Sequence, residues 1–138
     1  MAYATAQHII DRYSLDELLI LTDRDQDDQP DTAVLDGALN DATAEIDTYL
    51  ASRYQLPLAT VPDVLLRLCV DIAMYRLAAD RTGGTEERRK RYEDAERLLV
   101  RISKGNVSLG IPKPPKSSNG AVLVAGPGRQ FKRGSFRP

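Results

Sequence analysis

The stretch PDVLLRLCVDIAMYRLAADR at residues 62–81 decides the fold. It leaves few polar positions and shows no strand alternation, while Pro62 sits where the first turn of a helix tolerates proline. A helix that is apolar around most of its circumference is normally buried among other elements. Its charges and short apolar runs argue against a membrane span. The stretch therefore predicts the central helix of a small helical bundle.

The few charges of this helix form two groups. At helical spacing, Asp63, Arg67 and Asp71 make one narrow polar stripe, and Arg76 and Asp80 fall on nearly the opposite side. Arg76 and Asp80 have the i, i+4 spacing of an ion pair. This pair is either structural, near the helix end, or part of a contact between subunits, because a buried charge must find a partner.

Composition indicates one helical domain with an aliphatic core. The chain has 138 residues, no Trp, two Phe and six Tyr, so Leu, Ile, Val and Ala must fill the core. The single cysteine, Cys69, excludes an internal disulfide and is predicted to be a small buried residue. No export signal is visible at the N-terminus, so we expect the chain to be made and used in a cytosol.

Charge is distributed unevenly along the chain. Residues 104–138 carry seven basic and no acidic residues, which leaves 12 basic and 20 acidic residues, a net charge of −8, in residues 1–103. Such a tail suits an acidic face of another copy, a different protein or a nucleic acid.

Four more helices are predicted around the central one. Two are short, at residues 6–13 and 15–21, and two are long, at 32–54 and 86–103. The residues predicted to cap or close them are Thr5, Ser14 with Glu17, Thr85 and Gly105. In the second short helix the residues expected to be buried are Leu15, Leu18, Leu19 and Leu21.

The basic run RRKR at 88–91 imitates a nucleic-acid patch. It is accompanied by acids at i, i+4 spacing, in the pairs Glu86/Lys90, Glu87/Arg91 and Glu93/Arg97. We therefore interpret the run as a locally neutralised, solvated helix face.

The acidic stretch TDRDQDDQPD at 22–31 is predicted to be a loop. Its alternating acids Asp23, Asp25 and Asp27 imitate the start of a calcium loop. However, Asp28 occupies the sixth position, where glycine is needed, and Val34 the twelfth, where a bidentate Glu belongs. A solvated acidic loop before the next helix is the favoured interpretation.

Composition changes after residue 105. NVSLGI at 106–111 is predicted to form a short strand, 113–120 a linker, and AVLVA at 121–125 a second strand. We divide the chain into a helical domain, 1–110, and an extended basic arm, 111–138. The arm either folds back or, as we favour, adds to another subunit. Its predicted contact residues are Val122, Leu123, Val124, Arg129, Phe131, Lys132, Arg133 and Phe136.

No catalytic, cofactor-binding or metal site is predicted. The chain lacks a P-loop, a glycine-rich loop after a strand and the spacing of a two-histidine zinc site. His8 is its one histidine, without a nearby cysteine, and no serine is framed as a nucleophile. No two acids share a predicted apolar pocket that would raise the pKa of one of them.

Several segments of the chain, taken together with the order in which they occur, resemble the Mu-like phage and prophage family of head–tail connector proteins, also called adaptor or neck proteins. These segments are LTDRD at 21–25, DATAEIDTYLASRYQLPL at 41–58, VPDVLLRLCVDIAMYRL at 61–77, TEERRKRYEDAERLL at 85–99 and GNVSLG at 105–110. The resemblance covers residues 3 to 110 well and fits GRQFKRGSF at 128–136 more loosely.

The resemblance implies a non-enzymatic virion protein that assembles as a ring, expected to be twelve-fold, beneath the portal. Its expected partners are further copies of itself, the portal, a tail-side neck or terminator protein and the DNA passing through the ring, with no membrane. It implies a place in the virion neck, after assembly in the host cytoplasm. The residues with the highest density of acids, and so the candidates to face the channel, are Asp23, Asp25, Asp27 and Asp28.

Two other functions compete with a connector. A nucleic-acid-binding module would place RQFKRGSFR at 129–137 on phosphates and stack Phe131 and Phe136 on bases. A small enzyme or enzyme regulator would need a pocket with converging polar groups, and the sequence supplies no motif for one.

Overall fold

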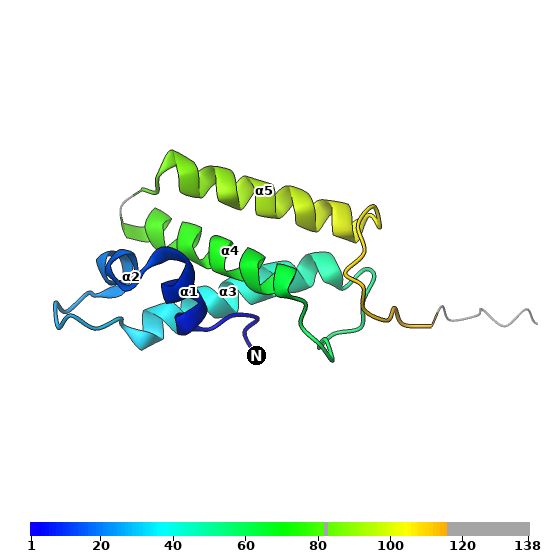
Figure 1. The fold of residues 1–138 in the computed structure, drawn as a ribbon, viewed down its shortest axis with the longest axis horizontal. Coiled ribbons are helices and arrows are strands. Elements are labelled where there is room, and N and C mark those ends of the chain that lie inside the picture. The colour runs from blue at the N-terminus through cyan, green and yellow to red at the C-terminus, as the bar shows by residue number, and fades with distance from the viewer. Residues whose placement is uncertain (82, 116–138) are drawn as a thin grey trace, which may run out of the picture.

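The computed structural model describes residues 1–81 and 83–115 of the chain. These residues form helices and contain no strand, which confirms the predicted mainly helical bundle. The helices are α1 (Ala6–Tyr13), α2 (Leu15–Thr22), α3 (Thr32–Leu50), α4 (Asp63–Arg81) and α5 (Glu86–Ser103). Three long helices, α3, α4 and α5, pack along one another, and the short α1–α2 hairpin lies beside them (Figure 1).

Helix α4 is the centre of the bundle, as its composition predicts. It packs against all four other helices. Burying one large aliphatic side chain contributes about 1.5–3 kcal/mol, so this helix supplies much of the stability of the core. Its large apolar side chains with at most 3% exposure are Leu65, Leu68, Val70, Ile72, Met74 and Leu77.

Local capping explains where several helices begin and end. The Asp31 carboxylate accepts from the Ala33 backbone N–H at 3.1 Å and starts α3. The Thr85 hydroxyl accepts from the Arg88 N–H at 3.3 Å and starts α5. After α5 the chain reverses at Gly105, whose φ of 81° lies in the left-handed region that glycine adopts without strain.

Two predicted elements differ from the structure. Helix α3 ends at Leu50, not at residue 54, because the chain turns there to bury Tyr54. The predicted strand at 106–111 is wrong, because the Leu109 N–H donates to the Tyr54 hydroxyl at 3.1 Å instead of to a neighbouring strand. Tyr54 therefore anchors the segment that follows α5.

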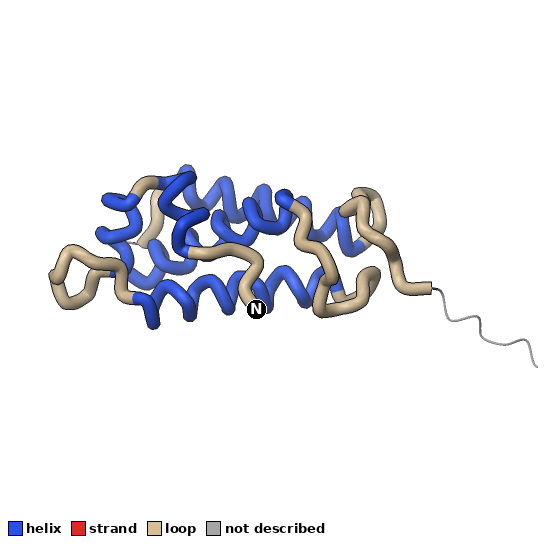
Figure 2. The backbone as a smooth tube through the Cα atoms, turned by 60° about the horizontal axis from the view of Figure 1, so that its bottom comes forward, coloured by secondary structure: helices blue, strands red, loops and turns tan. Residues whose placement is uncertain are grey.

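The bundle has two distinct ends. The acidic loop between α2 and α3 lies near the turn between α4 and α5, while residues 51–62 and 104–115 lie at the other end (Figures 1 and 2). The described chain therefore leaves the bundle at the end opposite to the acidic loop. The second predicted strand, 121–125, lies outside the described residues.

Candidate interaction surfaces

An acid on α3 connects three helices. The Glu45 side chain, only 14% exposed, forms an ion pair with Arg76 of α4 and accepts from the Tyr92 hydroxyl of α5 at 2.9 Å. Tyr92 stacks on Tyr75 with ring centroids 4.4 Å apart. Burial and then the hydrogen bond to Glu45 raise the pKa of Tyr92 to about 12. Glu45 thus fixes the position of Arg76 on the surface.

The predicted ion pair between Arg76 and Asp80 is wrong. Arg76 reaches across to Glu45 instead, and Asp80 is exposed, with no ion pair to any residue in the described ranges. A tertiary acceptor outcompetes the i, i+4 partner here because Glu45 is held on a neighbouring helix and is itself largely buried. The contact between subunits predicted for Arg76 and Asp80 stays a prediction.

Arg76 and Asp80 line a groove of about 520 Å³ between α3 and α4, with Tyr92 at one side. Small residues line much of it, namely Ala33, Gly37, Ala38 and Ala79. Two cations and two acids also line it, namely Arg24, Arg76, Asp41 and Asp80. A methyl group added at Gly37 would meet no atom within 4 Å, so the groove is open above this residue.

The outer face of α2 is a second surface of interest. Leu18 and Leu21 are buried, but Leu15 is 44% and Ile20 is 62% exposed. The prediction that Leu15 is buried is therefore wrong, because an eight-residue helix at the edge of the bundle covers the core with one side only. The exposed carboxylate of Asp16 lies between Leu15 and Ile20, at about 100° around α2 from Leu15 and about 40° from Ile20.

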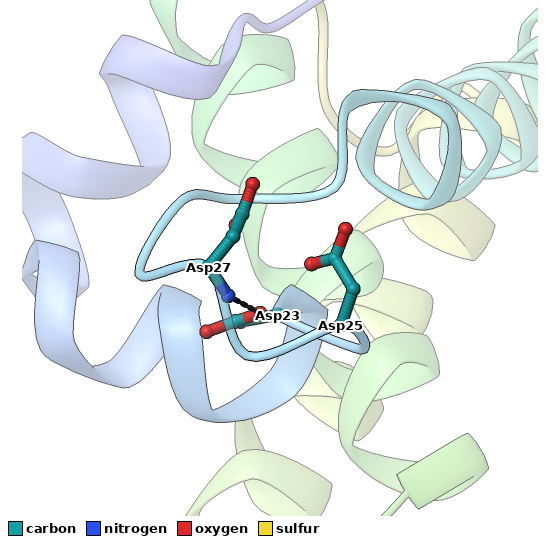
Figure 3. Close-up of side chains that lie close together, drawn as sticks. All are labelled: Asp23, Asp25 and Asp27. Carbon is teal, nitrogen blue, oxygen red and sulfur yellow. Dashed lines mark hydrogen bonds between the residues drawn. The ribbon is translucent and has the colours of Figure 1, made fainter.

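Three loop aspartates lie close together (Figure 3). Carboxylate oxygens of Asp23, Asp25 and Asp27 lie within 4.8 Å of one another. Asp23 accepts from the backbone N–H groups of Gln26 at 2.7 Å and Asp28 at 3.2 Å, which folds the loop around its carboxylate. The charge of Asp27 raises the pKa of Asp25. The cluster is thus a local concentration of negative charge held by a turn.

The run RRKR on α5 is neutralised by acids, as predicted. Each of its cations lies within 4.0 Å of a carboxylate. The pairs are Arg88–Glu17 at 3.5 Å, Arg89–Glu86 at 2.8 Å, Lys90–Glu86 at 4.0 Å and Arg91–Glu87 at 2.5 Å. These cations therefore offer little free charge to phosphates.

The predicted polar stripe of α4 divides between two environments. Asp63 and Arg67 are exposed, but Asp71 is only 7% exposed. Its carboxylate accepts from the Tyr13 hydroxyl at 2.8 Å and from Arg12 Nε at 3.2 Å. Asp71 therefore fastens α1 to α4, and sequence spacing alone does not reveal this role.

Two residues with reactive side chains have structural contacts. His8 Nδ1 accepts from the Thr5 backbone N–H at 3.1 Å, at the start of α1. Cys69 is fully buried beside the Thr43 hydroxyl, and burial raises the pKa of its thiol. Among the helices in the described ranges, none is long and apolar enough to cross a membrane.

The remaining predicted contact residues, in the segment 122–136, lie outside the described part of the chain. The residues that sequence reasoning missed are Glu45, Gly37 and Arg24. Of these three, only Gly37 could have been singled out from the sequence. Glycine inside a helix costs about 1 kcal/mol of helix stability relative to alanine, so its presence there is unusual.

Comparison with known proteins identifies the relatives of this chain. The family described as "Bacteriophage Mu, Gp36" matches residues 3–125. The chain is 40% identical over 124 residues to "Mu-like prophage FluMu protein gp36" of Haemophilus influenzae, covering 88% of this chain and 86% of that protein. It is also 40% identical over 126 residues to "Gene product J" of Escherichia phage Mu, covering 90% and 88% of the two chains.

Proposed function

Because the chain belongs to the bacteriophage Mu Gp36 family, we propose that it is a structural protein of the virion that connects head to tail. Copies form a ring, one per portal subunit and so twelve on a twelve-fold portal. The ring binds the portal on one side and a tail-side neck or terminator protein on the other. DNA passes through its centre, and the protein acts by shape and interface burial, without enzymatic chemistry.

The observation that carries this proposal is the arrangement of charge. The cations of the RRKR run on α5 are neutralised by neighbouring acids, while the aspartates Asp23, Asp25 and Asp27 gather at one end of the bundle. Affinity for DNA comes mainly from free Lys and Arg contacts to phosphates. A body with a net charge of −8 over residues 1–103, whose basic run is paired with acids, lets DNA slide past without sticking.

The basic arm supplies the second part of the proposal. It begins where the described chain leaves the bundle, at the end opposite to the acidic loop. Seven basic and no acidic residues over 104–138 suit an acidic surface on the portal or on a neighbouring body. We propose that the arm docks there through the apolar residues of 121–125 and the basic residues beyond them.

Disruption of the gene in its phage or prophage tests this function. The connector function predicts DNA-filled heads and separate tails that do not join, and it predicts the protein in purified wild-type particles. Complete particles formed without the protein would contradict it. Complementation with the intact gene is the control and should restore joined particles.

The basic tail also favours a second candidate function, a nucleic-acid-binding module that uses residues 127–138. This candidate predicts DNA binding that weakens steeply with salt and disappears when these residues are removed. Fluorescence anisotropy with a labelled duplex over a salt series separates the two functions. A connector body predicts weak binding at physiological salt.

A further inference from the structure

We propose that opposite ends of the bundle bind each other in neighbouring copies, with Ile20 of one copy seated in an apolar groove at the far end of the next. This inference rests on the proposed ring and names the surfaces that would form it. A contact between two different surfaces of the same chain is heterologous, and such contacts close into rings when the rotation between copies permits.

The receiving end holds a groove of about 440 Å³ between the loop that precedes α4 and the segment that follows α5. Apolar side chains supply most of its lining, among them Leu56, Leu58, Ile111 and Pro112. Its volume lies within the range of pockets that enclose small-molecule ligands. The groove can therefore hold an aliphatic side chain from another copy.

The charge of this receiving end is basic. Lys113 is the one charged residue in the lining of the groove. The two segments at this end, residues 51–62 and 104–115, carry the basic residues Arg53, Lys104 and Lys113 and no acid. None of these three cations has an ion pair to another described residue. The groove therefore favours an occupant with negative charge beside its apolar part.

The helix ends around the groove do not cancel this charge. Counting four residues of each helix at this end adds one cation, Arg101, and two acids, Asp47 and Asp63. The Asp47 carboxylate already accepts from the Tyr3 hydroxyl. The C-termini of α3 and α5 each contribute only about half a negative charge, and the N-terminus of α4 about half a positive one. Positive charge thus remains in excess.

The inserting end combines an exposed apolar side chain with acids. Ile20 is 62% exposed on α2, at the end of the bundle that holds the acidic loop (Figure 1). Asp16 lies one turn earlier, about 40° around the helix from Ile20, and is exposed without an ion pair in the described ranges. Residues 14–31 contain seven acids and one base, Arg24. Ile20 is therefore an apolar protrusion in acidic surroundings.

Neighbouring turns leave this negative excess unchanged. The last turn of α4 and the first turn of α5 add equal numbers of acids and bases, namely Asp80, Glu86 and Glu87 against Arg81, Arg88 and Arg89. Opposite ends of one chain thus have opposite charge, and each offers the apolar feature that the other lacks. Seating Ile20 in the groove would bring Asp16 towards Lys113.

The length of the bundle makes this a contact between copies. Helix α3 has 19 residues, so it is about 28 Å long and holds the two ends of one chain apart. A chain cannot place its own Ile20 in its own groove, and each copy therefore contacts two neighbours. The aspartates of the 22–31 loop then lie between copies, and the wall of the channel draws on other acids of the body.

The basic arm fits the groove less well. AVLVA at 121–125 is also apolar, but residues 129–137 would bring four more cations beside Lys113 and Lys104. Like charges placed together cost free energy. The same basic residues suit the acidic end of the neighbour, which this contact brings beside the point where the arm begins.

Cross-linking of mixed single-cysteine variants tests this contact. One variant carries Ile20→Cys and the other Thr60→Cys, an exposed position in the groove lining, and native Cys69 remains because it is fully buried. The two are mixed under conditions where the wild type associates, alone or on the portal, and treated with a short bismaleimide. We expect several-fold more cross-linked dimer than from either variant alone. Cross-linking of Thr60→Cys to Val122→Cys instead would place the arm in the groove and overturn the contact.

Charge reversal gives an independent result. Asp16→Lys and Lys113→Glu should each weaken association several-fold, because each places like charges together in the contact. The double variant Asp16→Lys/Lys113→Glu restores opposite charges and should regain most of the lost affinity, which a purely structural role of either residue does not predict. Ala44→Lys, at an exposed position on α3 away from both ends, should associate like the wild type. Sedimentation over a concentration series measures each variant.

Equal cross-linking in the mixture and in each variant alone, or a double variant that associates no better than the single ones, would overturn this contact and leave the connector function standing. A wild type that stays monomeric at every concentration, alone and with the portal, would overturn the ring as well.

Discussion

Glu45 on α3 and Arg76 on α4 form an ion pair that takes Arg76 away from Asp80, its neighbour one turn along α4. Glu45 is largely buried, while the Arg76 side chain is 42% exposed and lies along the groove. Substitution of Glu45 and substitution of Arg76 should therefore have different effects on the protein. Glu45 organises the monomer, and we predict that Arg76 presents its charge to a partner.

Arg76→Met should weaken assembly more than it destabilises the monomer. The methionine keeps much of the apolar stem, and a partly exposed ion pair contributes only about 0–1 kcal/mol. Glu45→Ala should cost about 1–3 kcal/mol, because it also leaves the Tyr92 hydroxyl without its acceptor. Urea unfolding measures both changes, and light scattering measures assembly. A larger loss of stability in Arg76→Met than in Glu45→Ala would show that Arg76 mainly stabilises the monomer.

Stability should fall at alkaline pH because of partly buried tyrosines. Burial and Glu45 raise the pKa of Tyr92 to about 12, and burial also raises the pKa of Tyr3, Tyr13 and Tyr49. An unfolded tyrosine loses its proton near pH 10, so the unfolded state binds fewer protons above that pH. The contribution of Tyr92 is thus complete below about pH 10 and is lost as the pH rises towards about 12. Urea unfolding from pH 9 to 12 should show this decline.

Tyr92→Phe is the matched control for the alkaline decline. It removes one ionising group, so its stability should fall less steeply over the same pH range. An identical slope in both proteins would show that Tyr92 ionises at the same pH when folded and unfolded.

Two glycine substitutions should have opposite effects on stability. The φ of Gly105 is +81°, and an alanine Cβ there would overlap the Arg53 guanidinium, so Gly105→Ala should destabilise by about 1–2 kcal/mol. Gly37→Ala meets no atom and improves helix propensity, so it should stabilise by about 0.5–1 kcal/mol. Thermal unfolding of both variants checks the signs. Destabilisation by Gly37→Ala would mean that the groove is filled within the monomer.

Deletion of residues 120–138 should leave the fold intact and weaken association. Among the described residues, the core side chains lie within residues 1–111, so the unfolding midpoint should stay close to that of the full chain. Binding to the portal or to other copies should fall, because the deletion removes the apolar run and most of the basic residues of the arm. Circular dichroism and light scattering make the comparison. Collapse of the fold would place the arm in the core.

Helix bounds that depend on neighbouring residues could be predicted from the sequence. The bounds of α1 and α5 agree with the prediction, and α4 begins one residue later, at Asp63. Thr85 and Gly105 mark the ends of α5 by short-range hydrogen bonds and backbone conformation, which neighbouring residues determine.

Features that depend on tertiary contacts could not be predicted from the sequence. The end of α3 depends on the burial of Tyr54 and its bond to Leu109, which is 55 residues away. The partner of Arg76 is an acid on another helix, and the exposure of Leu15 depends on where the hairpin lies. Helical periodicity places residues on faces, but the face that meets the core is decided by the whole bundle.

The most direct test of the connector is negative-stain imaging of the full chain mixed with its cognate portal, with light scattering over a concentration series. The predicted result is a closed ring of added density on one end of the portal, with one copy per portal subunit. Portal particles without added density, together with a chain that stays monomeric throughout, would contradict the connector function.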